Sequence, residues 1–579
     1  MTATVAHRNG PCFCYAAAVR VFFLSQEKPV RSCPAMPSMT SGAFATVLTA
    51  LVAACGVSGA AVQTRQEQQS THVLADLDYG SFQGAYSQQY NISYWQKIPY
   101  AAPPVGENRF RGPQPPAAVE GGVYDSSQPF DMCPQRTVNG SEDCLYLGLY
   151  SRPWTKGQPL KPVVVTFYGG GFIQGSAYFN IPPSAYPILN VSTSSDMMFI
   201  YPNYRTNAFG LLPGKEIAAD PKSDLNPGLL DQEAVLKWTK KYVQHFGGNP
   251  DDVTVWGQSA GGGSVLAQAL GRGGKQKLFR KAMASSPFWP KTYAYDSPEA
   301  QALYDELAAR TGCAGPDSLA CLKKADVQAI RDASLVISGS HVTNTSSFTW
   351  SPVIDGDFLR EPLSSAAAAG KVNMELAFAM HNTHEGENFL PAGLQSAADA
   401  GSPPFNSSDA SFDKWLRGFL PGFGDCEIEG VKRLYPANGT TETISYGTNY
   451  VRAGLIYRDV ILSCPALWFA GAAPKGGWLG EYSLDPSKHA SDTVWWNQIN
   501  AVQKSEPARY QGYAGAFASF FQTGDPNALK LSPSTTAGVP SLNESKEWVI
   551  EPAGFATADL GQLEKRCGFW KKTAAKIPM

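Results

Sequence analysis

The segment Gly257-Gln258-Ser259-Ala260-Gly261 directly follows a short apolar run, Val253–Trp256. A strand, then Gly-x-Ser-x-Gly, then a helix makes a turn so sharp that the serine backbone is strained and its hydroxyl is lifted out of the sheet edge. The glycines two residues before and after the serine are needed because a side chain would not fit there. The pentapeptide alone is weak evidence in a chain with 55 glycines, so the remaining sequence has to support a serine nucleophile.

Strand and helix patterns alternate around this turn. The runs 161–167 and 197–201 have the continuous apolar character of buried strands. Residues 230–246 have helical apolar spacing, 94–101 resemble an edge strand, and 563–576 form a basic helical tail. Strands that alternate with helices predict an α/β protein with a large, mostly parallel central sheet flanked by helices.

Length and charge limit the alternatives. The chain has 579 residues, but it contains no linker, charge block or internal repeat, so we expect residues 62–579 to form a single domain. The net charge is -2 and no basic stripe is present, which argues against nucleic acid as a partner.

The first part of the chain has the composition of a targeting segment. Residues 32–64 carry no charge, 43–55 are apolar, and Ser58-Gly59-Ala60 supplies the small residues of a cleavage site. We therefore expect a leader with a signal peptide over residues 1–61 and a secreted, extracellular protein. The apolar core of this leader is too short for a stable membrane span, and we expect no such span in the mature protein. Because the segment before it is long, Met36 or Met39 is a better start, and residues 1–38 are not expected in the native protein.

Seven N-x-Ser/Thr sequons follow the leader, and in a secreted chain they predict N-linked glycans. Their asparagines are Asn91, Asn139, Asn190, Asn344, Asn406, Asn438 and Asn543.

A serine nucleophile needs a base within hydrogen-bond reach and a carboxylate that orients the base. The strand–turn–helix arrangement of the serine resembles that of α/β-hydrolases, in which the acid and then the histidine follow the serine in chain order. Among seven histidines, His489 alone lies well downstream in a loop. The others lie in the leader, before Ser259 or close to the candidate acids; they are His7, His72, His245, His341, His381 and His384.

We expect Glu385 to be the acid, because it follows the apolar run 376–380 and so lies at the carboxyl end of a strand, where α/β sites are built. Glu387, Asp355 and Asp357 remain alternatives. His381 and His384 lie beside Glu385 and Glu387, but their spacing matches no zinc-protease pattern, and we expect neither a metal nor a cofactor.

A second glycine motif supports the same chemistry. Tyr168-Gly169-Gly170-Gly171-Phe172 directly follows the strand 161–167. Three successive glycines expose backbone N–H groups to a developing oxyanion. We expect the N–H groups of Gly170, Gly171 and Ala260 to form the oxyanion hole.

Several separated motifs resemble the type-B carboxylesterase and lipase family, an α/β-hydrolase family that includes cholinesterases and fungal secreted esterases. They are Ile98–Phe110, Ser141–Leu147, Gly169–Phe172, Gly228–Gln232, Phe246–Pro250, Gly257–Gly261, Glu385-Gly386 and His489. The resemblance covers roughly residues 77–575. Gln258 stands where the family usually has glutamate, and Gly148 where it usually has asparagine. Losing the negative charge at position 258 makes a choline ester a less probable substrate.

The resemblance also implies how the cysteines and some charged residues pair. It implies disulfides Cys133–Cys144, Cys313–Cys321 and Cys464–Cys567, with Cys426–Cys464 as an alternative to the third. It implies two buried ion pairs, Arg109–Glu142 and Arg205–Asp231.

Together these features predict a secreted serine esterase that hydrolyses small to medium apolar esters through an acyl-enzyme. Aromatic side chains of Phe172, Phe288, Trp289, Phe389, Trp495 and Trp496 are candidates for a substrate pocket, although each is also typical of an ordinary core. The alternatives are a lipase of the same family that acts on longer acyl chains and a non-catalytic adhesion module. In lipases and cholinesterases of the family that the chain resembles, the loop closed by the first disulfide is long and carries the lid or a tryptophan that meets choline. Only ten residues separate Cys133 from Cys144, and we therefore expect an open site without a lid.

Overall fold

The computed structural model of the protein describes residues 73–177, 180–192, 196–345, 349–530 and 538–579. All of these described residues belong to one compact unit. The predicted leader, residues 1–61, lies outside the described residues.

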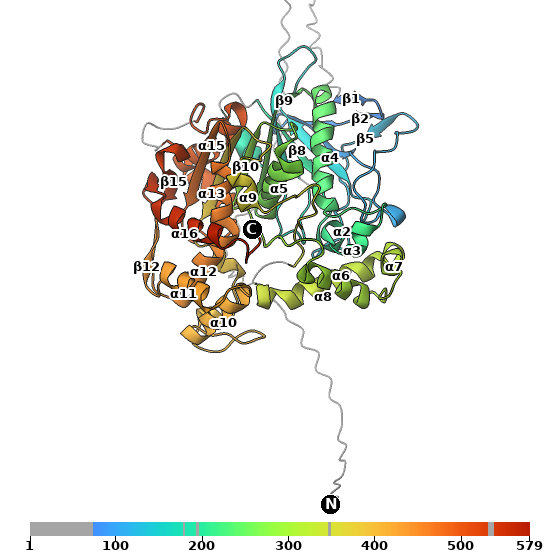
Figure 1. The fold of residues 1–579 in the computed structure, drawn as a ribbon. Helices are drawn as coiled ribbons and strands as arrows, with labels where there is room; N and C mark the ends of the chain where they lie inside the picture. Colours follow the sequence, from blue (N-terminus) through green and yellow to red (C-terminus); the bar gives the residue numbers. More distant parts are fainter. Residues whose placement is uncertain (1–72, 178–179, 193–195, 346–348, 531–537) are drawn as a thin grey trace, which may run out of the picture. The chain divides into compact units, whose positions relative to one another are not determined.

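A central sheet of 11 strands runs through this unit (Figure 1). In spatial order the strands are β16 (Gly554–Asp559), β15 (Lys546–Glu551), β14 (Gly476–Tyr482), β11 (Leu376–Asn382), β10 (Lys281–Ser285), β9 (Gly248–Gln258), β7 (Lys161–Phe167), β8 (Met198–Pro202), β6 (Tyr146–Ser151), β4 (Ile92–Pro99) and β3 (Ala85–Ser87). From β15 to β8 all neighbours are parallel, and the pairs at both edges are antiparallel. The expected α/β class and mostly parallel sheet are confirmed. The segment expected as the edge strand is β4, which lies second from the edge because β3 pairs with it.

Helices cover both faces of this sheet, and this explains why successive residues in the middle of the central strands are apolar. Val163 and Val165 pack into one core, whereas Val164 between them packs into the other. The first core contains residues of α4 (Pro227–Tyr242) and α5 (Ala260–Gly274), and the second contains residues of α15 (Pro507–Thr523). A strand buried on both faces needs an apolar side chain at every position.

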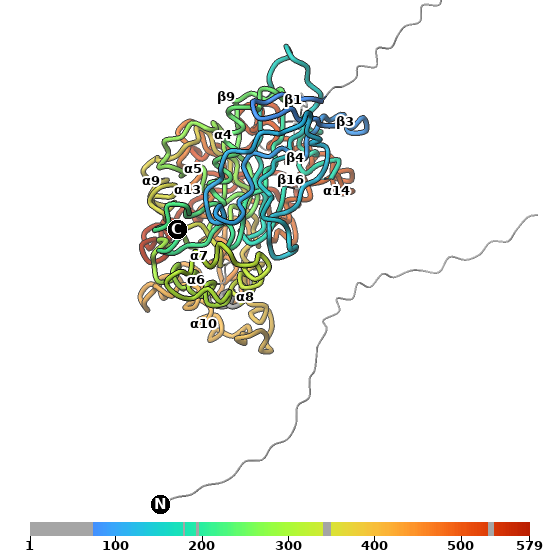
Figure 2. The backbone as a smooth tube through the Cα atoms, turned by 90° about the vertical axis from the view of Figure 1, so that its right-hand side faces the viewer, coloured from blue at the N-terminus to red at the C-terminus, as the bar shows by residue number. Residues whose placement is uncertain are grey.

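A group of helices gathers at one end of the unit, as Figures 1 and 2 both show. It includes α6 (Pro298–Arg310), α8 (Val327–Thr345) and α10 (Asp409–Phe419). A smaller sheet consists of β1 (Leu74–Leu77), β2 (Gly80–Gln83) and β5 (Val123–Asp125).

One long apolar helical segment, Asn449–Gly471, combines α12 (Asn449–Arg458), η5 (Asp459–Ser463) and α13 (Cys464–Gly471). Among the described residues it is the one segment whose length and composition would allow it to cross a membrane. Its apolar window is 89% buried inside the protein, as is typical of a core helix.

Candidate active site

Ser259 lies at the turn between β9 and α5, with φ 60° and ψ -125°. A Cβ atom on Gly257 would lie 2.3 Å from Gly261, and one on Gly261 would lie 2.1 Å from the carbonyl oxygen of Phe167. Both glycines are therefore required by space, as the sequence predicts. The Ser259 N–H donates to Ser285 O at 3.0 Å, which ties the turn to β10.

Three side chains from distant parts of the chain meet at this turn. His489 Nε2 lies 2.8 Å from Ser259 Oγ, and His489 Nδ1 lies 3.0 Å from Glu385 Oε2. Glu385 begins the 3-10 turn η3 (Glu385–Phe389) just after β11, and His489 lies in the loop after β14. The second Glu385 oxygen accepts from the Asn382 N–H at 3.1 Å, which fixes the carboxylate. A chain of hydroxyl, imidazole and carboxylate at these distances has the geometry of an activated nucleophile.

The glycine turn after β7 passes directly beside the serine. A Cβ atom on Gly169 would lie 3.0 Å from Ser259 Cβ. Gly170 and Gly171 have φ of 120° and 63°, values that glycine adopts without strain. Ala260 begins α5 immediately after Ser259. Of the three residues predicted for the oxyanion hole, Ala260 thus directly follows the nucleophile, and Gly170 and Gly171 directly follow Gly169, which approaches it in space.

The other acid candidates have different partners. Glu387 contacts His384 Nδ1 at 2.7 Å and also pairs with Lys488. Asp355 accepts from Asn226 at 2.6 Å, and Asp357 pairs with Arg272. Only Glu385 among the four is within hydrogen-bond distance of His489.

The histidines and glutamates near Glu385 do not form one metal cluster. His381 instead pairs with Glu547 at 3.0 Å, close to Glu481. Arg458 Nη1 lies 3.2 Å from Glu481 Oε1, so one carboxylate of this buried group already has a cationic partner.

Further residues that sequence reasoning did not single out hold the base. Asn388 Oδ1 accepts from the His489 N–H at 2.9 Å, and Asn382 Nδ2 donates to Lys488 O at 2.7 Å. Buried Asp492 accepts from Trp496 and Tyr513. Burial raises the pKa of the Asp492 carboxyl, despite these donors. No signal in a single sequence distinguishes these side chains from ordinary loop residues.

The predicted pocket aromatics divide between the two cores. Phe172, Phe288 and Trp289 pack in the first core, with Phe389 against it. The Phe389 ring lies 5.1 Å from the His489 ring, and the Phe288 ring lies 5.7 Å from Phe389. Trp495 and Trp496 instead pack in the second core, where Trp495 donates to Tyr482 OH at 3.1 Å. Trp495 and Trp496 therefore lie on the other face of the sheet and are not part of the aromatic group beside His489.

The disulfides and scaffold ion pairs form as expected. Cys133–Cys144, Cys313–Cys321 and Cys464–Cys567 are bonded, with Cα atoms 5.2, 5.4 and 5.2 Å apart. Cys426 is free and exposed, so the alternative Cys426–Cys464 pairing is wrong.

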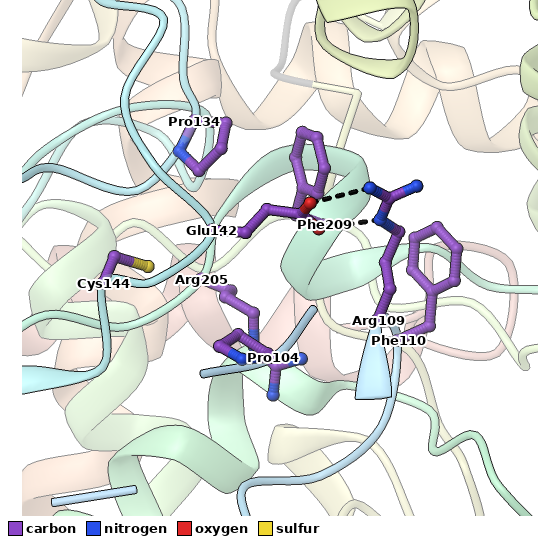
Figure 3. Close-up of a pocket in the computed structure, with 8 residues that line it drawn as sticks. All are labelled: Pro104, Arg109, Phe110, Pro134, Glu142, Cys144, Arg205 and Phe209. Carbon is purple, nitrogen blue, oxygen red and sulfur yellow. Dashed lines mark hydrogen bonds and ion pairs between the residues drawn. The ribbon is translucent and has the colours of Figure 1, made fainter. Parts of the chain in front are cut away.

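Arg109–Glu142 and Arg205–Asp231 are buried bidentate pairs with closest contacts of 2.7 Å. Both border a cavity of about 10 Å³ that Figure 3 shows, together with Pro134 and Cys144. A space of this size holds about one water molecule, so the cavity is a gap in the scaffold and not a substrate site.

The expectation of an open site is met only in part. Residues 134–143 form no helix, so this loop carries no lid helix. Ser259 is nevertheless only 7% exposed and the His489 side chain only 11% exposed. Phe389, packed against the imidazole, contributes to this burial.

An 11-stranded sheet with a serine at the turn between β9 and α5 defines an α/β-hydrolase. The model of the carboxylesterase family matches residues 70–551, and the chain belongs to this family.

Individual relatives agree with this assignment. Carboxylesterase patB of Aspergillus clavatus is 27% identical over 561 residues, which cover 86% of this chain and 96% of the relative. A secreted lipase of Arthroderma benhamiae is 29% identical over 455 residues, which cover 74% and 82%. The crystal structure of Aspergillus niger EstA has the same fold, with a TM-score of 0.73, 24% identity, and coverage of 87% of this chain and 99% of that one.

Proposed function

We propose that the protein is a secreted serine carboxylic-ester hydrolase that acts on small to medium apolar esters. The observation that carries the proposal is the continuous contact from Ser259 Oγ through His489 to Glu385, at 2.8 and 3.0 Å. Membership of the carboxylesterase family supports ester hydrolysis as the reaction.

In the proposed mechanism, Ser259 Oγ attacks the ester carbonyl carbon while His489 Nε2 takes the hydroxyl proton. Glu385 stabilises the resulting imidazolium. The N–H groups of Gly170, Gly171 and Ala260 stabilise the oxyanion of the tetrahedral intermediate. When the intermediate collapses, the alcohol leaves with the proton from His489 and an acyl-enzyme remains. Water, activated by the same histidine, then releases the carboxylic acid and regenerates the serine.

Ser259→Ala tests this assignment. It should lower the kcat for p-nitrophenyl butyrate by at least ~10³-fold, because the nucleophile acts as one unit with its base. Ser365→Ala, an exposed serine on α9 (Leu363–Ala368), is the matched control and should keep full activity. A Ser259→Ala protein with near-wild-type activity would refute the nucleophile. A wild-type protein inactive on a panel of esters would instead favour the adhesion module.

A lipase is the second candidate, because a relative is named a secreted lipase. The loop closed by Cys133–Cys144 argues against it, since it contains no helix that could serve as an apolar lid. Hydrolysis of p-nitrophenyl esters of short and long chains, with and without an emulsion, separates the two. A jump in rate on long chains above their solubility limit would favour the lipase.

Secretion and N-glycosylation are part of the proposal. The side chains of Asn91, Asn139, Asn190, Asn438 and Asn543 are exposed and that of Asn406 is half-exposed, as attachment of a glycan requires. The side chain of Asn344 lies outside the described residues. A loss of mass on enzymatic deglycosylation of the secreted protein would support this, and an unchanged mass would oppose it.

A further inference from the structure

The loop closed by Cys133–Cys144 is bonded to the glycine turn that supplies the oxyanion hole. The contact is made by Gln135, which is only 1% exposed. Its Nε2 donates to Gly175 O at 2.8 Å, and its Oε1 accepts from the Gly175 N–H at 2.7 Å. One amide side chain thus satisfies both polar main-chain groups of Gly175, as a neighbouring strand would.

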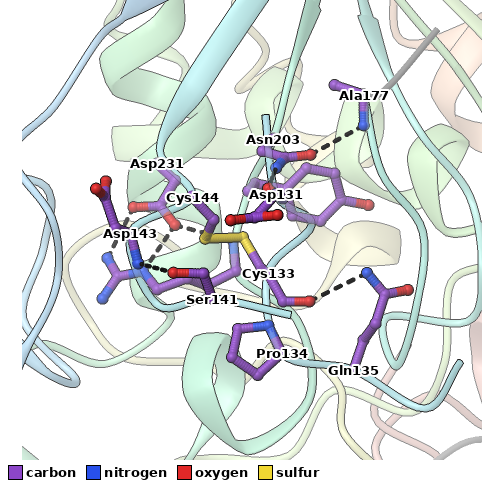
Figure 4. Close-up of a disulfide and its surroundings, with 12 residues drawn as sticks. Asp131, Cys133, Pro134, Gln135, Ser141, Asp143, Cys144, Ala177, Asn203 and Asp231 are labelled. Atoms are coloured by element: carbon purple, nitrogen blue, oxygen red, sulfur yellow. Dashed lines mark hydrogen bonds and ion pairs between the residues drawn. A yellow bond between two sulfur atoms is a disulfide. The ribbon is translucent and has the colours of Figure 1, made fainter. Parts of the chain in front are cut away.

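The loop is in turn fixed around Gln135. The Gln135 Nε2 also donates to Cys133 O at 3.2 Å, next to the disulfide (Figure 4). Arg331, on α8, donates to Gln135 O at 2.7 Å. The Arg136 N–H donates to Ile173 O at 3.4 Å, which adds a second link to the turn.

A second amide holds the segment that follows the turn. Asn203 Oδ1 accepts from the Ala177 N–H at 2.9 Å, and Asn203 Nδ2 donates to Asp131 O at 3.1 Å. Figure 4 shows Asn203 and Gln135 on either side of the Cys133–Cys144 disulfide. The stretch 131–135 is therefore connected to 175–177 at two points.

A displacement of Gly175 would be passed directly to the oxyanion donors. Gly175 has φ 122°, and a Cβ atom there would lie 2.3 Å from both Gly169 O and the Tyr168 ring. At the other end of the turn, Gly170 O accepts from the N–H groups of Ile173 and Gln174 at 3.1 and 3.2 Å. The turn is therefore closely packed around Gly175 and tied together by its own hydrogen bonds.

We propose that Gln135 is a positioning residue for the oxyanion hole, and that the short disulfide loop acts as a brace for the glycine turn. This inference rests on the proposed function. A catalytic group has to be held within roughly 0.5 Å of its productive position by the packing and hydrogen bonds behind it. Gln135 supplies two such bonds, and the disulfide and Arg331 keep Gln135 in place.

Gln135→Met tests the brace, because it keeps the length of the side chain and removes both bonds to Gly175. We expect kcat to fall about 10- to 100-fold with little change in KM, less than the ~10²–10³-fold loss caused by removing an oxyanion donor itself. Gln503→Met is the matched control. Gln503 is also a buried glutamine that donates to two carbonyl groups, those of Val494 and Gln498, at 2.8 and 2.9 Å. It should lose thermal stability but keep kcat.

A second measurement separates positioning from a structural role. The affinity for a trifluoromethyl ketone, whose adduct with serine places an oxyanion in the hole, should fall in parallel with kcat. A Gln135→Met protein with a lower Tm but unchanged kcat and inhibitor affinity would overturn the inference. If Gln135→Met does not fold, Gln135→Asn retains an amide and withdraws it by one methylene group. It should show the same losses in part, and full activity in this variant would also overturn the inference.

The outcome is distinguishable from a failure of the proposed function. If the wild-type protein hydrolyses no ester, or Ser259→Ala remains active, the proposed function is wrong. If the wild type is active and Ser259→Ala is inactive, but Gln135→Met matches the wild type in both kcat and inhibitor affinity, only the brace is wrong.

Discussion

The glycine turn after β7 and the two loops that carry Glu385 and His489 both adjoin Ser259, yet different contacts hold them. The turn is held by neutral amide groups, above all the two bonds between Gln135 and Gly175. The loops are held by the amides of Asn382 and Asn388 and, in addition, by an ion-paired group, because Glu387 pairs with both His384 and Lys488. Lys488 immediately precedes His489, so this ion pair joins the acid-bearing loop to the base.

Because the contacts differ, the glycine turn and the two loops should respond differently to mutation and to pH. Neutral hydrogen bonds in a packed turn depend on shape and change little with pH, whereas ion pairs depend on protonation and on the sign of each charge. Substitutions that add bulk in the glycine turn should therefore lower activity through the oxyanion hole. Substitutions that remove a charge in the two loops should lower activity through Glu385 and His489.

Gly175→Ala should have the largest effect on the turn. The added Cβ would meet Gly169 O and the Tyr168 ring at 2.3 Å, which displaces the oxyanion donors. We expect kcat for p-nitrophenyl butyrate to fall by about 10²-fold, as when an oxyanion donor is lost, with an unchanged pH profile. Gly157→Ala is the control, because Gly157 also has a positive φ, 102°, but nothing lies within 4 Å of an added Cβ. More than half of the wild-type kcat in Gly175→Ala would contradict the steric account.

Lys488→Met should have the next largest effect, on the acid–base side. Removing this charge releases the backbone beside His489 from Glu387, and we expect kcat to fall about tenfold, less than the ~10²-fold cost of a 1 Å misplacement. Lys488→Arg keeps the charge and should restore most of the activity. Steady-state kinetics of Glu387→Gln, Lys488→Met and the double variant complete the test, since coupled residues give non-additive losses.

Lys432→Met is the matched control for the ion pair. Lys432 Nζ lies 2.8 Å from Asp413, and the side chain is 24% exposed compared with 35% for Lys488. Its loss should leave kcat unchanged. Equal losses in Lys432→Met and Lys488→Met would show that the effect is not specific to the loops of the site.

Acid pH should have the smallest effect, a loss of stability that comes from the ion-paired Glu387 and not from the glycine turn. Burial acts to raise the pKa of the Glu387 carboxyl, but hydrogen bonds from His384 and Lys488 outweigh it, so the pKa lies below its usual value. A carboxyl with a lowered folded-state pKa stabilises the protein above its unfolded pKa, and this stability is lost as the pH falls through the folded pKa.

The Tm of the wild type should therefore fall more than that of Glu387→Gln between about pH 5 and about pH 3. Asp492, whose pKa is raised by burial, contributes with the opposite sign in both proteins and cancels in the comparison. Parallel Tm curves for the two proteins would show that the Glu387 pair adds no pH-dependent stability.

The sequence predicts well whatever a local constraint enforces. The turn at Ser259 needs glycines on both sides for reasons of space, and the strand before it must be apolar on both faces. The family resemblance adds what no local pattern contains, such as the long-range Cys464–Cys567 pair. The resemblance also supports the choice of His489 and Glu385, which lie within hydrogen-bond distance of each other although more than a hundred residues separate them.

Contacts that depend on how two loops meet were not predictable in the same way. Gln135 lies 40 positions from Gly175, and neither residue carries a sequence signal of the other. Trp495 lies close to His489 in sequence, yet it packs on the opposite face of the sheet because the chain enters the 3-10 turn η6 (Ser491–Trp495). The Glu387–Lys488 ion pair could not be predicted either, since charged loop residues are usually solvated.

The Cys464–Cys567 disulfide joins two cysteines that are 103 positions apart in the chain. His489 lies between them, whereas Ser259 and Glu385 precede both. A protease that cut one peptide bond between the two cysteines would thus produce two fragments that remain covalently joined, with the base still attached to the part that carries the nucleophile. If the protein is secreted, as proposed above, extracellular proteases could nick this region without separating the base from the nucleophile. On a gel, such damage would become visible only after reduction.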